Sequence, residues 1–260
     1  MTHVSLVTGA SSGIGYHIAR ELALRGEPVV LVSRDPEGIQ AVATELSKEF
    51  GVDAWGFGFD LTDQDSRKEL VHAIESHDLQ IKYLVNNAGF GNYGPLAETD
   101  IQKELAMIEL NDSALVELCY LAIPHMKKIG YGRILNVAST AAFIPGPLMA
   151  VYYATKAFVL SFSAALREEL IDETISVTTL CPGPTRSRFQ EHANLEESKL
   201  FSNESRLPTA ESVAEFAVEE LMKGSGIVSP GIGNKLTIWV SRFVPRSLAA
   251  KMVKQFQAKK

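Results

Sequence analysis

Short apolar runs alternate with helix-length amphipathic segments along most of the chain, and this alternation constrains the fold more than any other feature. The strand-like runs lie at 4–8, 29–32, 55–59, 83–86, 133–137, 175–180 and 226–229, and helical patterns lie at 36–50, 63–77, 98–128, 150–172 and 210–223. Strands that alternate with helices form a parallel sheet covered on both faces, with right-handed crossovers. We predict an α/β fold, a doubly wound Rossmann-type sheet of about seven strands. No linker or repeat divides the chain, so residues 1–260 are expected to form one domain.

A glycine-rich turn follows the first apolar run, and Ile18 and Leu22 continue a helical pattern behind it. Free backbone N–H groups at a helix N-terminus attract phosphate, and glycine allows a diphosphate to approach the turn closely. The spacing is G-x-x-x-G-x-G rather than G-x-G-x-x-G. The alternative is a glycine-rich turn that binds no nucleotide. We predict a dinucleotide site formed by Gly9, Ser11, Ser12, Gly13, Ile14 and Gly15.

Ser33 and Arg34 follow the second apolar run, where dinucleotide-binding proteins meet the adenosine ribose. An acidic residue there holds the 2′-hydroxyl of NAD, whereas Arg34 can bind a 2′-phosphate with its fork of donors. Asp35 is better suited to cap the next helix. We therefore predict NADP(H) as the cofactor; the alternative is that Arg34 points into solvent.

Tyr152 and Lys156 are four residues apart in a helical pattern, which places them on one face about one turn apart. A nearby ammonium favours the phenolate and lowers the pKa of a tyrosine. We predict that Lys156 makes Tyr152 acidic enough to exchange a proton with a substrate oxygen. Taken alone, such a pair is also common on protein surfaces. Ser139 ends the preceding strand, so its hydroxyl and Tyr152 can converge on one carbonyl oxygen.

Asn87, Ala88 and Gly89 follow the fourth strand, and Pro182 and Gly183 follow the sixth, so all lie at one edge of the predicted sheet. With these segments in place, the chain resembles the short-chain dehydrogenase/reductase family from about residue 3 to about residue 230. The resemblance rests on motifs in family order at 8–15, 60–62, 86–89, Asn111, Ser139, Tyr152 with Lys156, and 182–183.

The resemblance implies a role for each motif. Tyr152 is expected to be the general acid/base and Ser139 to stabilise the substrate oxygen; Lys156 would also hold the nicotinamide ribose. Asn111 would support a water that relays protons to Lys156, although it can instead bond locally within a helix. Asp60 and Leu61 would contact the adenine side, with a helix N-cap near Thr62 as the alternative role for Asp60. The remaining expected cofactor contacts are Asn87, Ala88, Gly89, Pro182, Gly183, Thr185 and Ser187.

The chain departs from the family pattern at two places. Thr185 stands where the family often has an aliphatic residue, so either Thr185 or Ser187 is expected to contact the nicotinamide carboxamide. The segment 232–260 does not follow the common family ending and resembles a branch of poorly characterised bacterial oxidoreductases that has Asn234 and the pair Pro245-Arg246.

The net charge of −6 is spread unevenly. Seven of the 25 basic residues and none of the 31 acidic ones lie from Lys235 onward, which leaves 18 basic and 31 acidic residues before it. This basic, aromatic-bearing extension could lie on an anionic membrane, but packing on its own acidic domain or on a second subunit is the preferred interpretation. An acidic body argues against nucleic acid as a partner.

Two cysteines, Cys119 and Cys181, lie in apolar segments and are predicted to be reduced core thiols, as in a cytoplasmic protein. They provide no metal-ligand cluster, and we predict no metal. Residues 134–155 lack charged side chains, but Asn136 and two prolines argue against a membrane span. The chain enters its first strand directly, so no signal peptide is expected.

The predicted activity is an NADP(H)-dependent interconversion of a carbonyl and an alcohol, with reduction of an apolar ketone or a 3-oxoacyl compound as the favoured reaction. Residues 185–210 are predicted to form a substrate lid. The rivals are an NADP(H)-binding sensor or scaffold without turnover and a membrane-docked lipid reductase. The resemblance implies a homodimer or homotetramer through 98–128 and 150–172. The predicted apolar pocket consists of Phe90, Tyr93, Phe143, Pro145, Met149 and Phe189.

Overall fold

The computed structural model describes residues 1–187, 189–192 and 207–257. Seven parallel strands form one sheet in the order β3-β2-β1-β4-β5-β6-β7. Their bounds are β1 Thr2–Thr8, β2 Val29–Ser33, β3 Ala54–Gly58, β4 Leu79–Asn86, β5 Gly132–Val137, β6 Ile175–Leu180 and β7 Ile227–Val228. The predicted doubly wound α/β fold is confirmed, and the strand order reverses between β1 and β4.

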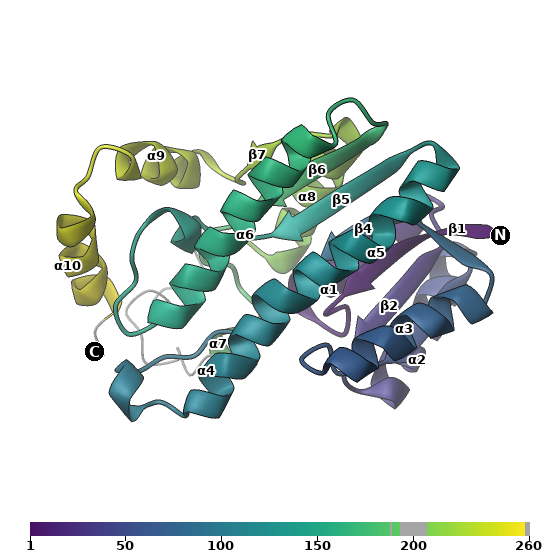
Figure 1. Ribbon diagram of the computed structural model, residues 1–260, viewed down its shortest axis with the longest axis horizontal. Coiled ribbons are helices and arrows are strands. Elements are labelled where there is room, and N and C mark those ends of the chain that lie inside the picture. Colours follow the sequence, from purple (N-terminus) through teal and green to yellow (C-terminus); the bar gives the residue numbers. More distant parts are fainter. Residues whose placement is uncertain (188, 193–206, 258–260) are drawn as a thin grey trace.

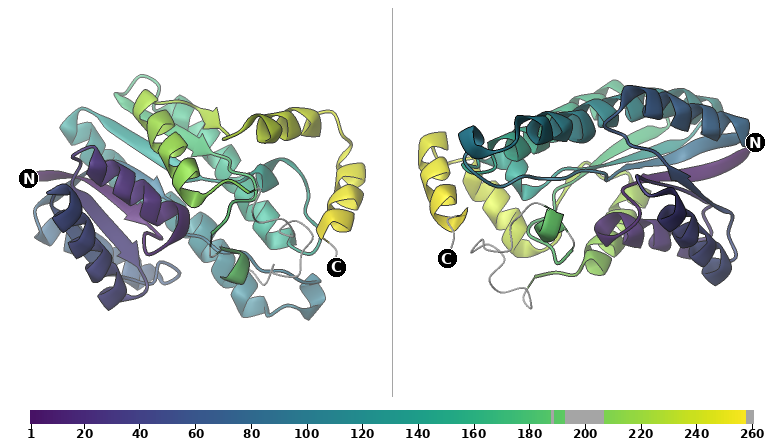
Figure 2. Two further views of the ribbon diagram at one scale, coloured as in Figure 1. Left: turned by 180° about the vertical axis from the view of Figure 1, so that it is seen from behind. Right: turned by 90° about the horizontal axis from the view of Figure 1, so that it is seen from below.

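Helices cover both faces of the sheet (Figures 1 and 2). They are α1 Gly13–Leu24, α2 Pro36–Phe50, α3 Gln64–Ser76, α4 Ile101–Ile108, α5 Ala114–Ile129, α6 Ala150–Glu169, α7 Phe189–His192, α8 Ala210–Lys223, α9 Ile232–Ser241 and α10 Arg246–Gln257. Short 3-10 segments lie at Leu96–Glu98 and Thr140–Phe143. The segment 134–155 is divided among β5, a 3-10 turn and α6, and no helix in the described ranges is long and apolar enough to cross a membrane.

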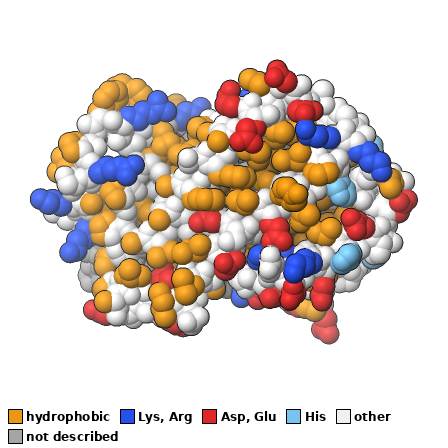
Figure 3. Space-filling model, in the orientation of Figure 1, with side chains coloured by type: hydrophobic (Ala, Val, Ile, Leu, Met, Phe, Trp, Pro, Cys, Tyr) orange, Lys and Arg blue, Asp and Glu red, His pale blue; other side chains and the backbone are white. Residues whose placement is uncertain are grey.

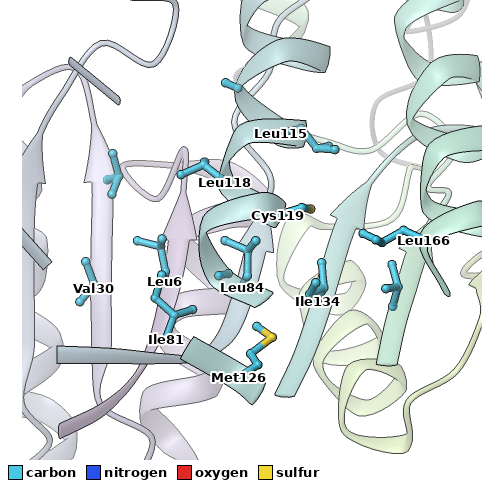
Figure 4. Close-up of a cluster of buried hydrophobic side chains, with 14 of the residues drawn as sticks. Leu6, Val30, Ile81, Leu84, Leu115, Leu118, Cys119, Met126, Ile134 and Leu166 are labelled. Atoms are coloured by element: carbon cyan, nitrogen blue, oxygen red, sulfur yellow. The ribbon is translucent and has the colours of Figure 1, made fainter. Parts of the chain in front are cut away.

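Alternate residues of each central strand face two separate cores. Leu6, Leu84 and Ile134 point to the face that α3, α5 and α6 cover (Figure 4). Val7, Leu31 and Leu135 point to the other face, where α1, α2 and α8 pack. This alternation follows from the two-residue period of a strand, and it explains why the strand sequences are continuously apolar. Cys119 and Cys181 are both buried and free, which confirms them as core thiols.

The predicted helix at 98–128 is interrupted. It consists of α4, a π-helical turn at Glu109–Ser113 and then α5. The side chain of Asn111 in this turn bonds to Phe90 and Thr155 on two neighbouring segments rather than to its own helix. A π-turn inserts one extra residue and often marks a functional site. The π-turn therefore places Asn111 against Phe90, which lines the candidate site.

Candidate functional site

A cavity of about 1200 Å³ opens at the carboxyl ends of the strands, across the point where the strand order reverses. Open parallel sheets bind their ligands in this crevice. The cavity is lined by the turns after β1, β2, β3, β4, β5 and β6 and by the C-terminal helices. Of the predicted site residues, only Gly15 and Asn111 do not line it; all the others do.

The phosphate end of the cavity is the turn between β1 and α1. Gly9 and Gly13 have φ angles of 64° and 59°, which favour glycine, and a Cβ on Gly9 would lie 2.9 Å from Ala88 Cα. Ser12 is the N-cap of α1, but its side chain accepts no capping hydrogen bond, and the first turn holds no acidic residue. Among the described residues, the first N–H groups of α1 therefore have no side-chain acceptor, as a phosphate-binding turn requires.

Gly15 packs against this turn from α1 and does not line the cavity. A Cβ there would overlap the carbonyl oxygen of Gly9 and the Nδ2 atom of Asn87. Asn87 Nδ2 donates to the carbonyls of Thr8 (3.0 Å) and Gly9 (3.2 Å), which ties the β4 end to the turn. Gly15 was predicted as a cofactor contact; the structure instead gives it a packing role that shapes the turn.

Ser33 and Arg34, the predicted adenosine-side residues, line the cavity where it meets the end of β2. Arg34 is exposed and lines the cavity, and it makes no salt bridge with another described residue. Asp35 caps α2, as predicted, by accepting from Gly38 N at 3.1 Å. Because the Asp35 carboxylate caps α2, it does not pair with Arg34, and the Arg34 guanidinium can bind a ligand.

Asp60 shapes the next turn of the same wall. Its carboxylate accepts from the backbone N–H and the hydroxyl of Thr62, at 3.0 and 2.8 Å. The N-cap of α3 is Asp63, which accepts from Ser66 N at 2.8 Å. The alternative role of Asp60 as the cap of this helix is therefore wrong. Leu61 is nearly fully buried beside Asp60 and lines the cavity.

Ser139, Tyr152 and Lys156 meet on one wall of the cavity. Ser139 lies two residues after the end of β5, caps the following 3-10 turn by accepting from Ala141 N (3.1 Å), and donates to the carbonyl of Pro182 at 3.4 Å. Tyr152 and Lys156 lie in the first two turns of α6. Lys156 Nζ donates to the carbonyl of Val137 at 2.8 Å and lies 5.9 Å from the centre of the Tyr152 ring. The three predicted residues are thus brought together.

Burial shifts the pKa values of both Tyr152 and Lys156. Burial raises the pKa of Tyr152 above its usual value near 10, and a hydrogen bond with Ser139 only partly offsets this rise. Burial also lowers the pKa of Lys156 to about 8, against the attraction of Asp112. The Tyr152 pKa therefore shifts in the direction opposite to the prediction, because burial of the phenol outweighs the hydrogen bond with Ser139.

Asn111 lies behind the cavity, where it braces the wall. Its Nδ2 donates to the Phe90 carbonyl (3.1 Å) and to Thr155 Oγ1 (3.0 Å), and its Oδ1 accepts from Phe90 N (3.2 Å). The side chain therefore links three segments, and the alternative of a local helix bond is wrong. A Cβ on Gly89 would lie 2.9 Å from Asn111 Oδ1 and 3.5 Å from Lys156 Nζ, so Asn111 and Lys156 share one corner.

Asp112 is a feature of this corner that the sequence analysis missed. Its Oδ1 atom is buried without a hydrogen-bond partner among the described residues. Burial raises the pKa of Asp112 to about 7, while the Lys156 ammonium pulls it down. The sequence gives no signal that Asp112 interacts with the charge of Lys156, because Asp112 lies in a helical pattern and the π-turn is not visible there.

Thr185 and Ser187 both line the cavity but differ in their surroundings. Thr185 is buried, and its hydroxyl donates to the Gly183 carbonyl at 2.9 Å. Ser187 accepts from Phe189 N at 3.4 Å, and its Cβ lies 3.5 Å from the place a Cβ on Gly13 would take. Ser187 therefore stands beside the phosphate turn. Most of the predicted lid, at 193–206, lies outside the described residues.

Residues of α9 and α10 also line the cavity, and the predicted pocket did not include them. Gln257 is fully buried; its Nε2 donates to Tyr153 Oη at 2.7 Å and its carbonyl accepts from Tyr93 Oη at 2.5 Å. Asn234 lies 2.9 Å, by its Cγ, from where a Cβ on Gly183 would be. Of the predicted pocket, Phe90, Met149 and Phe189 line the cavity, while Tyr93, Phe143 and Pro145 do not.

Comparisons with known proteins agree with this geometry. The family of short chain dehydrogenases matches residues 3–198. The chain is 31% identical over 249 residues to the 11-beta-hydroxysteroid dehydrogenase-like 4A of Arabidopsis thaliana, which covers 95% of this chain and 83% of that protein. It is 35% identical over 175 residues to the very-long-chain 3-oxoacyl-CoA reductase of Coprinopsis cinerea, over 66% of this chain and 52% of that protein.

A solved structure is similar over nearly the whole chain. The short-chain dehydrogenase from Sphingobium yanoikuyae in complex with NADPH superposes with a TM-score of 0.82 at 29% identity, covering 94% of this chain and 93% of that one. The family match spans residues 3–198, which is most of this chain. The protein therefore belongs to the short chain dehydrogenase family of oxidoreductases.

Proposed function

We propose that this protein is an NADPH-dependent carbonyl reductase that acts on apolar ketones or 3-oxoacyl compounds. The observation that carries the proposal is the convergence of Ser139, Tyr152 and Lys156 in a cavity that apolar side chains of α9 and α10 also line. A nucleotide-binding sensor has no need of a proton donor beside an apolar chamber. The relatives named above support a lipophilic substrate, since one is a steroid dehydrogenase-like protein and another is an acyl-CoA reductase.

The residues of the chain suit the cofactor at both ends. The uncapped first turn of α1 and the glycines at positions 9 and 13 accept a diphosphate without steric conflict. Arg34 offers a charged fork at the adenosine end, where a 2′-phosphate distinguishes NADPH from NADH. Ser187 stands beside the phosphate turn, which leaves Thr185 and the Gly183 backbone nearer the nicotinamide end. NADPH bound in this way would supply a hydride to the carbonyl carbon.

The side chains then supply the proton and the charge stabilisation. Ser139 donates to the substrate oxygen as negative charge develops on it. Tyr152 gives that oxygen its proton, and its raised pKa keeps the proton in place until the oxygen becomes an alkoxide, which is far more basic than a phenolate. Lys156, with a pKa of about 8, is close enough to neutrality to return a proton to Tyr152 between turnovers. Asn111 and Asp112 hold the corner in which Lys156 lies.

The test is Tyr152→Phe, with Tyr153→Phe as the matched control. The two phenols are adjacent in the chain, and their ring centres are 6.0 Å apart, but Tyr153 bonds to Gln257 rather than to Ser139. Tyr152→Phe should lower kcat at least about 100-fold, as loss of a general acid does, with NADPH binding nearly unchanged. Tyr153→Phe should lose less than about tenfold.

Turnover is followed as NADPH consumption across a panel of carbonyl compounds of increasing apolar size. Equal turnover by Tyr152→Phe and the wild type would refute the assignment of the proton donor. NADPH binding by the wild type, without consumption for any carbonyl compound, would favour a sensor instead.

We also propose that the protein forms a homo-oligomer through α5 and α6. Tyr120 on α5 and Phe158 on α6 are 76% and 43% exposed, and Figure 3 shows hydrophobic side chains gathered over these two helices. Exposed apolar patches of this kind mark contact surfaces. Sedimentation of the wild type against Tyr120→Lys tests the proposal, and an unchanged sedimentation coefficient would contradict it.

A further inference from the structure

The C-terminal helices expose an apolar stripe. Figures 1 and 2 show α9 and α10 at the end of the molecule away from the N-terminus. No residue of α9 is buried, and α10 buries only Ala249, Val253 and Gln257. Large apolar side chains recur at helical spacing along both helices and are 42–87% exposed: Ile232, Leu236, Trp239, Val240, Phe243, Leu248, Met252 and Phe256. A soluble monomer rarely leaves so many together. Of the preferred interpretations, packing on the chain's own domain accounts for the buried side of α10 and for Ile238 of α9, which packs against the main core. It does not account for the exposed stripe, and a second subunit is considered below as its occupant.

Basic side chains border this stripe. Lys235, Arg242, Arg246, Lys251 and Lys254 are all exposed, and none forms a salt bridge with another described residue. No acidic residue occurs from Lys235 onward, although the chain before it carries 31 acidic and 18 basic residues. In Figure 3, Lys and Arg side chains lie among hydrophobic ones at the α9–α10 end. Cations that flank an apolar helical stripe are typical of helices that lie in a lipid interface.

We infer that the exposed apolar stripe of α9 and α10 docks on an anionic lipid bilayer. The apolar stripe would enter the boundary between headgroups and acyl chains, and the five cations would contact the acidic headgroups. The chain before Lys235, with 31 acidic and 18 basic residues, adds no attraction to such a surface. A second copy of the chain is a poorer occupant, because Leu236, Val240, Met252 and Phe256 of the stripe also line the cavity. A protein seated there would close the substrate side of the site.

Two residues of the stripe lie both on the proposed docking surface and in the lining of the cavity. Met252 and Phe256 are 46% and 61% exposed and yet line the cavity, so they stand at its mouth. A lipophilic carbonyl compound dissolved in the bilayer can then reach Tyr152 without crossing water. This last step rests on the proposed function, whereas docking does not. It narrows the substrate class to compounds that partition into lipid.

The test is flotation of the full-length protein with phosphatidylcholine vesicles and with vesicles that also contain phosphatidylglycerol. The wild type should bind the anionic vesicles. Trp239→Ser/Phe243→Ser removes two exposed aromatic rings that do not line the cavity, and it should lower the partition coefficient about tenfold or more. Arg242→Gln/Lys251→Gln should lower partition to anionic vesicles about 30-fold, because each cation near such a surface contributes about fivefold. Partition of Arg242→Gln/Lys251→Gln to the neutral phosphatidylcholine vesicles should equal that of the wild type.

Leu24→Ser/Ile171→Ser is the matched control, since these side chains are 57% and 66% exposed outside α9 and α10. This variant should bind the anionic vesicles as the wild type does. Docking is overturned if the wild type does not bind anionic vesicles, or if Trp239→Ser/Phe243→Ser binds as well as the wild type. It is also overturned if that variant changes a dimer into a monomer and leaves vesicle binding unaltered. Turnover of a water-soluble ketone is measured in parallel, so loss of the proposed activity is distinguishable from loss of docking.

Discussion

Gly15 provides the sharpest test of how the cofactor site is built, because it does not line the cavity. Replacing it with alanine places a methyl group against the carbonyl of Gly9, whose carbon would lie 2.9 Å away, and against the side chain of Asn87. A backbone carbonyl cannot rotate away as a flexible side chain does. The turn or the helix must move instead, and overpacking of this kind costs about 1–3 kcal/mol.

The movement should be felt mainly by the bound cofactor. The Gly9 carbonyl belongs to the phosphate turn, and Asn87 ties that turn to the end of β4. Losing one well-aligned hydrogen bond from a backbone N–H to a phosphate costs about 1.5–3 kcal/mol, which is a factor of about 10 to 150 in affinity. Gly15→Ala should therefore raise the dissociation constant of NADPH by that factor, measured by the fluorescence of the bound nicotinamide.

Gly233→Ala is the matched control. Gly233 also lies in a helix, α9, but a Cβ there meets nothing within 4 Å. This substitution should raise the free energy of unfolding by about 0.5–1 kcal/mol, because alanine favours a helix, and leave NADPH affinity unchanged. The reasoning is refuted if Gly15→Ala binds NADPH as the wild type does and gains stability as Gly233→Ala does.

Three further variants test other parts of the site. Lys156→Met removes a group whose pKa falls from 10.5 to about 8 on folding. Between these two pH values the folded wild type binds fewer protons than the unfolded chain, so its free energy of unfolding rises with pH. Across this range the rise should be about 3 kcal/mol larger for the wild type than for the variant. Parallel urea-unfolding profiles would contradict this. Arg34→Ser should raise the KM for NADPH about 10- to 100-fold and hardly alter that for NADH, and equal changes in both would assign Arg34 to solvent. Gln257→Met removes the bond to Tyr153 Oη and should raise the KM of bulky carbonyl substrates about fivefold, with kcat for a small ketone within about twofold; an unchanged KM would show that α10 does not shape the chamber.

Much of the fold follows from local pattern. The predicted helices at 36–50 and 210–223 coincide with α2 and α8, and the predicted strand at 175–180 coincides with β6. Asp35 caps α2 because an Asp before a proline-led helix is itself a local signal. Boundaries are less secure where no cap or glycine marks them. The helix at 98–128 is interrupted because Asn111 bonds to Phe90 and Thr155, and neither partner is visible in the local pattern.

The chemistry of the site divides in the same way. The sequence names Ser139, Tyr152 and Lys156, because strand ends and helical spacing bring such residues to one sheet edge. It does not give the direction of the Tyr152 pKa shift, since desolvation depends on every segment that covers the phenol. It also does not reveal that Asp112 faces Lys156, which depends on the π-turn.

By itself the sequence determined the order of strands and helices, the phosphate turn and the residues that carry the proposed chemistry, because each is encoded by residues near one another in the chain. Only the tertiary structure decided what surrounds them. Gly15 packs on Asn87, and Gln257 reaches Tyr153 across 104 residues of chain. The basic extension forms two helices that line the cavity and expose an apolar stripe, part of which lies at the cavity mouth. Such contacts depend on how distant segments pack, and no local period in the sequence encodes them.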